Sequence, residues 1–228
     1  TPEVVSFTKK AVAEYRAWCA EQHDLPITKA YGGHYFSPQQ AVWIDALRAK
    51  LPSNEPARTV ALAALIQAAS QSAASPGHTA QPFQPTKTAK RFLEDAWNRG
   101  IPIRTRSSFE ALANQCAQRV GSARVADANI AAAELLEGDL VFLDPPYSGV
   151  HYSRFYHVLE TIAQGTCGEV SGVGRYPAPV HRPRSSYSVT SESTFALNNL
   201  LESISLRGAR AILTFPDHVC SNGLSGDS

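Results

Sequence analysis

Residues 139–147 read DLVFLDPPY, and this stretch decides the fold class. The apolar run at 139–143 is typical of a strand buried in a sheet, and it ends at an acid followed by two prolines. Two more strand-like runs lie at 123–126 and 209–215. Between them, residues 128–137 resemble a helix or turn, and residues 152–164 and 191–206 resemble helices. Because strand and helix alternate, residues 121–228 are predicted to form a parallel sheet layered with helices, which is an α/β fold.

The first 120 residues have a helical pattern instead. Ser37 followed by Pro38 provides an N-cap and a proline at the first helical position, which predicts a helix that runs to about Lys50. Apolar periodicity and Ala/Leu-rich runs predict further helices at 2–22, 56–73, 87–98 and 107–119. Residues 169–190 are rich in Gly, Pro and Ser and are predicted to be a loop. We therefore expect two domains, a mainly helical region at 1–120 and the sheet-containing region at 121–228.

Bulk composition excludes several classes of protein. Hydrophobic residues are 43% of the chain and charged residues 18%, as in ordinary globular proteins, and the net charge of +1 does not itself indicate nucleic-acid binding. The four cysteines form no C-x-x-C pair, so no metal site is predicted, and no signal peptide or apolar run of transmembrane length is present. We expect a cytoplasmic protein that does not bind membranes. Since the chain starts at Thr1 and contains no Met, we also expect that an N-terminal part of the gene product is missing.

The motif Asp144-Pro145-Pro146-Tyr147 lies where a parallel sheet binds ligands, directly after a strand. The exocyclic amine of adenine is a poor nucleophile, because its lone pair is delocalised into the ring. The Asp144 carboxylate and the Pro145 carbonyl can accept hydrogen bonds from its two N–H groups, and two prolines make the turn rigid. Tyr147 can stack on a base that has been extruded from the duplex. The motif therefore predicts a catalytic loop for chemistry on a base amine.

The wider sequence resembles the Dam-like branch of the DPPY-motif DNA adenine-N6 methyltransferases. The similarity lies in LDPPYSGVHYSRFYHVLETI around the motif, in YGGHYFSPQQAVWIDALR at 31–48 and in ASPGHTAQPFQPT at 74–86. The resemblance implies a Rossmann-like methyltransferase core with a helical target-recognition insertion. It also implies S-adenosylmethionine as cofactor, DNA as partner, direct methyl transfer to adenine N6 with Asp144–Tyr147 as the catalytic loop, and a role in restriction-modification or defence.

One family feature is missing from this sequence. Members carry a Gly-rich F-x-G-x-G turn that holds the methionine part of the cofactor, and no such turn occurs in residues 1–228. Gly172-Val173-Gly174 follows the DPPY motif and lacks a preceding strand, so it is a weak match. We therefore expect an incomplete core whose N-terminal cofactor half is missing, with another chain or segment supplying the Gly-rich loop.

Further site residues are predicted around this loop. Asp127 and the neighbouring Ala128 are expected to contact the adenine end of the cofactor, as is Asp144, although Asp127 also suits a helix N-cap. Two basic segments, 84–120 with seven basic against three acidic residues and 171–190 with three against none, are either solvated faces or surfaces for DNA phosphates. Residues expected to contact DNA are His34, Tyr35, His78, Thr79, Gln81, His151, Tyr152 and Arg154.

Two other functions compete with DNA methylation. An RNA base methyltransferase can share the DPPY motif, although the large helical segment before the motif disfavours the small ribosomal RNA enzymes. A non-catalytic subunit that binds nucleic acid would explain the missing Gly-rich turn, whereas the intact DPPY motif argues against it.

Overall fold

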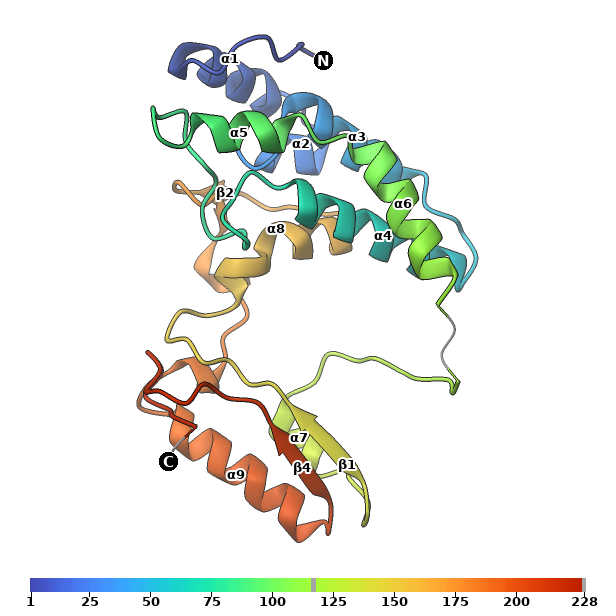
Figure 1. Cartoon of the computed structure of the whole chain (residues 1–228), viewed down its shortest axis with the longest axis vertical. Coiled ribbons are helices and arrows are strands. Elements are labelled where there is room, and N and C mark those ends of the chain that lie inside the picture. The colour runs from blue at the N-terminus through green and yellow to red at the C-terminus, as the bar shows by residue number, and fades with distance from the viewer. Residues whose placement is uncertain (116–117, 227–228) are drawn as a thin grey trace. The chain divides into compact units, whose positions relative to one another are not determined.

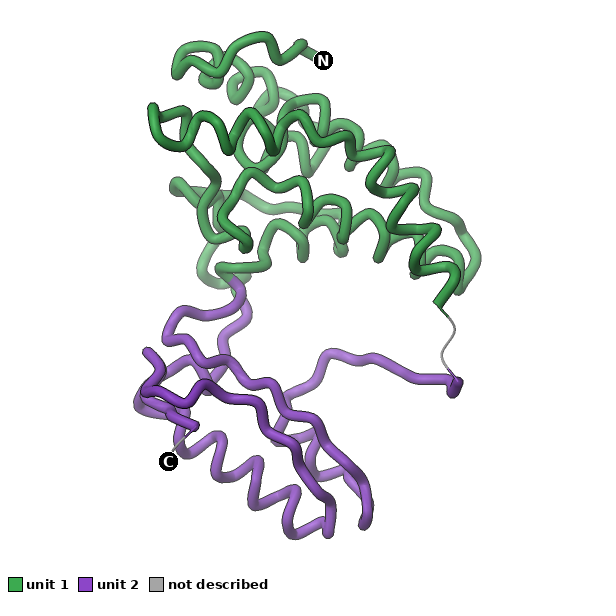
Figure 2. Tube along the Cα trace, in the orientation of Figure 1, with its two compact units in different colours: residues 1–117, 154–182 green, residues 118–153, 183–228 purple. Residues whose placement is uncertain are grey.

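The computed structural model describes residues 1–115 and 118–226, and the chain divides into two compact units (Figure 2). Unit 1 consists of Thr1–Ala117 and Arg154–Arg182, and unit 2 consists of Gln118–Ser153 and Pro183–Ser228. Both units are therefore discontinuous in sequence, because residues 154–182 belong to the unit formed by the N-terminal half. The first crossing between the units lies between residues 117 and 118, whereas the predicted domain boundary lies after residue 120, and the later return of the chain to unit 1 was not predicted.

Unit 1 is built mainly of helices (Figure 1). Its elements in chain order are α1 (Lys9–Ala20), α2 (Pro26–Tyr31), α3 (Pro38–Ala49), α4 (Ala57–Ser72), α5 (Lys90–Trp97), α6 (Ile101–Ala113), α8 (Ser153–Gln164), β2 (Val170–Ser171), β3 (Tyr176–Pro177) and the 3-10 helix η1 (Pro179–His181). The two short strands pair antiparallel within the segment that was predicted to be a loop. Every helix or strand named between residues 1 and 115 is a helix, from α1 to α6.

Local sequence explains where these helices begin. The Ser37 hydroxyl accepts a hydrogen bond from the Gln40 backbone N–H, and the Gln40 side chain accepts one from the Ser37 N–H, so α3 has a complete capping box. Helix α6 begins at Ile101, six residues before the predicted start, because a proline in its first turn fits a helix N-terminus. The end of the predicted helix at 107–119 includes residues 116–117, which lie outside the described residues.

Two apolar clusters form the interior of unit 1. The larger is built from α2, α3, α4 and α8, and includes the fully buried rings of Tyr31, Tyr35 and Phe36. Helix α8 contributes Val158 and Ile162 to this cluster. The smaller cluster joins α1 and α5 through residues such as Val12, Leu93 and Trp97. Burial of the apolar face of α8 among these helices is the physical reason that residues 154–182 belong to unit 1.

Unit 2 contains a small parallel sheet. Strand β1 (Leu140–Leu143) pairs with β4 (Arg210–Leu213), with Leu140 opposite Arg210 and Leu143 opposite Leu213. Helices α7 (Ala128–Ala132) and α9 (Ser193–Leu206) and the 3-10 helix η2 (Ser186–Ser188) supply an apolar cluster that packs against Val141 and Leu143. The structure thus confirms a mixed α/β chain with a parallel sheet.

The third predicted strand is wrong. Residues 123–126 form no strand in the described structure, and β1 pairs only with β4 among the described residues. The Val125 side chain is fully exposed, so no neighbouring strand or helix covers it. A short apolar pattern cannot form a strand without a partner for its backbone hydrogen bonds.

One face of the sheet carries exposed apolar side chains. Leu140 and Phe142 alternate with the packed Val141 and Leu143, and they are 62% and 65% exposed. Ile212, opposite Phe142 on β4, is half exposed. Parallel sheets are normally covered on both faces, so this face lacks a covering layer among the described residues. No helix in the described part of the chain is long and apolar enough to cross a membrane.

Candidate active site

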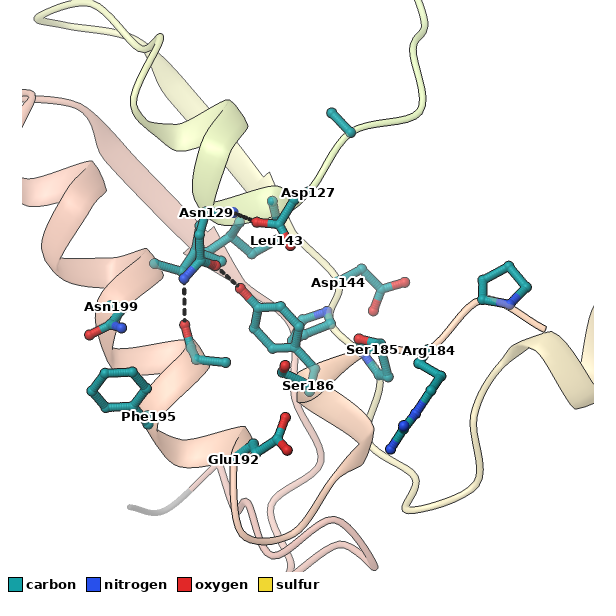
Figure 3. Close-up of a pocket in the computed structure, with 18 of the residues that line it drawn as sticks. Asp127, Asn129, Leu143, Asp144, Arg184, Ser185, Ser186, Glu192, Phe195 and Asn199 are labelled. Carbon is teal, nitrogen blue, oxygen red and sulfur yellow. Dashed lines mark hydrogen bonds between the residues drawn. The ribbon is translucent and has the colours of Figure 1, made fainter. Parts of the chain in front are cut away.

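Unit 2 contains a hollow of about 1060 Å³ at the carboxyl end of β1 (Figure 3). Four segments of this unit line it, and they include Val125–Asn129, Phe142–Pro146, Pro183–Tyr187 and residues of α9 such as Phe195 and Asn199. The hollow holds the carboxylates of Asp127, Asp144 and Glu192 and the guanidinium of Arg184. This position at a strand end is the one that α/β proteins use for ligands.

Asp144 lies directly beyond the last residue of β1 and is exposed to the hollow. Thr214 lies directly beyond β4, and its hydroxyl donates to Oδ1 of Asp144 at 2.9 Å. The Thr214 backbone N–H also donates to the Leu143 carbonyl at 3.0 Å, which continues the pairing of the two strands. The adjacent strand therefore orients the carboxylate, and Oδ2 has no such bond to Thr214.

The two prolines have different roles in the loop. The carbonyl of Pro146 accepts a hydrogen bond from Nδ2 of Asn222 at 2.8 Å, and Asn222 is completely buried and also donates to the Tyr187 carbonyl. Ser221 adds a second connection, because its hydroxyl accepts from the Gly149 N–H at 2.9 Å. Pro146 is thus fixed by the segment after β4, while Pro145 lines the hollow beside Asp144.

Asp127 caps helix α7 and lines the same hollow. Its Oδ1 accepts from the backbone N–H groups of Asn129 and Ile130 at 2.9 and 3.2 Å. The Asn129 amide in turn accepts from the Tyr187 hydroxyl, and burial followed by the charge of Asp127 raises the pKa of Tyr187 to about 12. Ala128, the first residue of α7, also lines the hollow. The helix-cap reading of Asp127 is therefore correct, and it places the carboxylate and Ala128 at the site together with Asp144 (Figure 3).

An aromatic cluster follows the two prolines. The Tyr147 side chain is 46% exposed, and its ring meets those of Tyr152 and Phe215 edge-on, with centroid distances of 6.3 and 6.4 Å. His151 lies in the same unit, where its Nδ1 accepts from the Ser185 N–H at 3.4 Å. Two of the predicted DNA contacts, His151 and Tyr152, thus belong to the unit that holds the loop Asp144–Tyr147.

Arg154 lies in unit 1, in the first turn of α8. Its guanidinium lies 4.7 Å from the centre of the Tyr176 ring, and that of Arg182 lies 5.3 Å from the same ring. Both contacts are cation–π interactions. The residue is exposed, so its charge remains available to a partner.

The remaining predicted DNA contacts lie in unit 1 and divide by burial. Tyr35 and Thr79 are buried, and the Tyr35 hydroxyl lies 2.6 Å from the Thr79 carbonyl while the Thr79 hydroxyl donates to the Phe155 carbonyl. This burial favours a packing role for both. His78 and Gln81 are exposed, and His34 is half-buried.

Sequence reasoning missed the residues that support the loop. Thr214 carries a recognisable signal, since it follows the last strand as Asp144 follows β1. Asn222 carries none, because it lies in a polar segment with no local pattern. The described residues contain no cluster of His, Cys, Asp and Glu that could hold a metal ion, although Cys116 lies outside that description.

Comparison with known proteins defines the class of this chain. Residues 28–206 match the model of the D12 class N6 adenine-specific DNA methyltransferases, and the chain belongs to this family. It is 39% identical over 70 residues to modification methylase LlaI of Lactococcus lactis subsp. lactis and 37% identical over 74 residues to type II methyltransferase M.FokI of Planomicrobium okeanokoites. These segments cover 30% and 32% of the chain but only 11% of each relative. No solved structure matches the chain.

Proposed function

We propose that this chain carries the methyl-transfer site of a DNA adenine-N6 methyltransferase. The reaction moves a methyl group from S-adenosylmethionine to the exocyclic N6 amine of an adenine that has been flipped out of DNA. One observation carries the proposal: the Asp144 carboxylate lies beyond the end of a parallel strand and lines a large hollow. One relative is named a modification methylase and the other a type II methyltransferase, which supports a role in restriction-modification or defence.

The loop residues perform the chemistry by accepting hydrogen bonds. One N–H of the adenine amine donates to the Asp144 carboxylate and the other to the Pro145 carbonyl, so the nitrogen lone pair is directed away from the ring. Thr214 holds Oδ1 of Asp144 in place before substrate arrives. Such preorganised electrostatic partners typically contribute about 10²–10³ in turnover. The amine would release one proton to solvent as it gains the methyl group, and the cofactor would leave without its methyl group as S-adenosylhomocysteine.

Tyr147 receives the flipped base in this proposal. Its ring is half exposed and is held edge-on by Tyr152 and Phe215, so one orientation is favoured before a base arrives. Stacking of a base on such an aromatic ring contributes roughly 1–3 kcal/mol. The exposed His78, Gln81 and Arg154 and the half-buried His34, His151 and Tyr152 are proposed to contact the DNA.

The residues around the hollow fit S-adenosylmethionine, which supplies an electrophilic methyl group when it is bound. The cofactor carries cationic groups and ribose hydroxyls, and Asp127 and Glu192 offer carboxylates to them. The exposed ring of Phe195 and the Ala128 backbone offer apolar and peptide surface to an adenine. Asp127, Ala128 and Asp144 are therefore proposed to hold the cofactor.

A further strand is proposed to complete the cofactor site. Strand β1 has a free edge among the described residues, and the face that bears Leu140 and Phe142 is uncovered. A segment or a second chain that pairs with β1 and carries a helix would cover this face and place a Gly-rich turn at the hollow. The helices of unit 1 are proposed to act as the target-recognition region.

Methyl transfer provides the test. The gene product that contains this chain is incubated with methyl-labelled S-adenosylmethionine and either duplex DNA or RNA, and the labelled nucleoside is identified. We expect N6-methyladenine in DNA. Label only in RNA would favour an RNA methyltransferase, and DNA binding without label in either polymer would favour a non-catalytic subunit.

A further inference from the structure

Two half-buried guanidinium groups flank the turn at Gly32–His34 in unit 1. Nε of Arg16, from α1, donates to the Gly33 carbonyl at 2.8 Å. Nε of Arg175, from the turn between β2 and β3, donates to the Ala30 carbonyl at 2.8 Å. A helix at the start of the chain and a hairpin more than 150 residues later thus bring two positive charges to one turn.

The turn itself is fixed against one of these arginines. Gly33 has φ of +71°, a conformation that favours glycine. A Cβ atom at Gly33 would lie 2.8 Å from Cγ of Arg16, so the glycine is also needed for close packing. The position of the Arg16 side chain relative to the turn is therefore determined by the backbone and is not that of a mobile surface arginine.

The two charges have no anionic partner within the described part of the chain. The ion pairs there involve neither arginine. Burial lowers the pKa of both guanidinium groups, and the charge of Arg175 lowers that of Arg16 further. Two like charges partly removed from water without a counter-ion carry a desolvation cost that an anionic ligand would offset.

Both charges act on His34, which belongs to the turn at Gly32–His34. Its pKa is lowered to about 3, first by burial and then by Arg16 and Arg175, so the imidazole is neutral at physiological pH. A neutral ring keeps one N–H donor. Arg16 also donates to the Gln84 side chain and Arg175 to the Lys29 carbonyl. These bonds leave several of the five N–H donors on each guanidinium for a ligand.

Arg48 is an arginine of the same unit whose donors meet a helix C-terminus. Its Nε and Nη2 donate to the carbonyls of Ile162 and Ala163 at 2.7 and 2.9 Å. These carbonyls belong to the last turn of α8, where the helix dipole places negative charge. Arg175 makes a similar contact with the Ala30 and Lys29 carbonyls in the last turn of α2. Arg16 bonds the Gly33 carbonyl beyond that helix instead, and the Arg175 charge adds to the cost of holding it.

We infer that Arg16, His34 and Arg175 form a binding site for a phosphate of the nucleic-acid backbone. Guanidinium groups bind phosphate through paired N–H donors, and contacts of this kind position a protein on DNA without reading the sequence. The inference rests on the proposed function for the identity of the polymer. It assigns to unit 1 a backbone contact that is separate from the chemistry at Asp144.

Duplex binding by the full chain at several salt concentrations tests the site. Loss of one phosphate contact lowers the slope of log K against log salt concentration by about 0.9, so R16Q/R175Q is expected to lower the slope by about this amount and to weaken binding about tenfold. The variant R16K/R175K keeps the charges and is expected to keep most of the slope. Lys10→Gln, which removes an exposed cation of α1 in the same unit and outside both basic segments, is the control and should leave the slope unchanged.

The outcomes separate the alternatives. A folded R16Q/R175Q variant with the wild-type salt slope would overturn the inference. A lysine variant as impaired as the glutamine variant would also overturn it, because the arginines would then act only through their carbonyl bonds.

The NMR signals of the His34 ring give a second measurement, and they should shift with duplex and not with inorganic phosphate alone. A shift with inorganic phosphate and none with duplex would also overturn it. If the gene product transfers methyl groups and R16Q/R175Q keeps the wild-type salt slope, only the phosphate site is contradicted. If the slope changes in R16Q/R175Q but the gene product transfers no methyl group, only the proposed function is contradicted.

Discussion

At Asp144-Pro145-Pro146-Tyr147 each residue has a separable physical role. Asp144 is oriented by Thr214, Pro146 is tied to Asn222, and Pro145 faces the hollow without an N–H that could compete for the substrate. The sequence predicts the acceptors and their place after a strand. It does not predict Asn222, because that contact spans 76 residues and depends on the path of the chain after β4.

Tyr147→Ala is expected to weaken capture of the extruded adenine. The substitution removes the stacking surface, which is worth roughly 1–3 kcal/mol, while Tyr147→Phe keeps the ring and should retain most of the effect. The measurement is the fluorescence of 2-aminopurine placed at the methylated adenine. Wild-type fluorescence enhancement in the alanine variant would show that the ring does not contact the base.

Among the secondary-structure elements, α2 depends on a side chain from a neighbouring helix. The Asp45 carboxylate, from α3, accepts from the Ile27 and Thr28 N–H groups at 3.0 and 2.8 Å and from the Thr28 hydroxyl at 2.7 Å. It thereby satisfies N–H groups at the start of α2 that would otherwise be unpaired and buried.

Asp45→Ala should therefore destabilise unit 1. Leaving a buried donor without a partner costs about 1–3 kcal/mol, and more than one donor is affected here. Denaturant unfolding of the whole chain measures the change, with Asp24→Ala at an exposed position as the control. Equal stability of the two variants would mean that the carboxylate does not stabilise α2.

The helices were predicted best where caps and composition agree. Ser37 is predicted as the N-cap of α3 and Pro38 as its first helical residue, and the structure agrees. The start of α6 is not predicted correctly, because the prediction does not use the proline at the second position of that helix. The false strand at 123–126 shows the limit of local patterns, since pairing depends on a neighbour that the pattern does not specify. The membership of α8 in unit 1 was likewise hidden, because burial depends on contacts distant in sequence.

At the scale of the whole molecule, the sheet of unit 2 is too small to stand alone. Two parallel strands with one apolar face exposed are normally part of a larger layered sheet. The small size of this sheet and the lack of an F-x-G-x-G turn in the sequence both lead us to expect an incomplete cofactor site.

Residues 1–228 alone are therefore expected to bind S-adenosylmethionine more weakly than micromolar. The carboxylates of the hollow remain, but the turn that holds the methionine part is missing. Titration calorimetry measures the affinity, and adding a segment with a Gly-rich turn should increase it. Micromolar binding by the chain alone would mean that residues described here already form the complete cradle.

The central claim, that Asp144 acts in methyl transfer, is tested most directly by measuring turnover and DNA affinity for the same variants of the active gene product. Asp144→Ala removes an acceptor for the amine, and Asp144→Asn removes the charge and can present N–H donors to it, so both should lower turnover by about 10²–10³ or more. DNA affinity should change little, because phosphate contacts dominate it. Asp217→Ala, at an exposed aspartate of the same unit, should leave both quantities unchanged. Near wild-type turnover by Asp144→Ala would contradict the account and make the loop a structural turn.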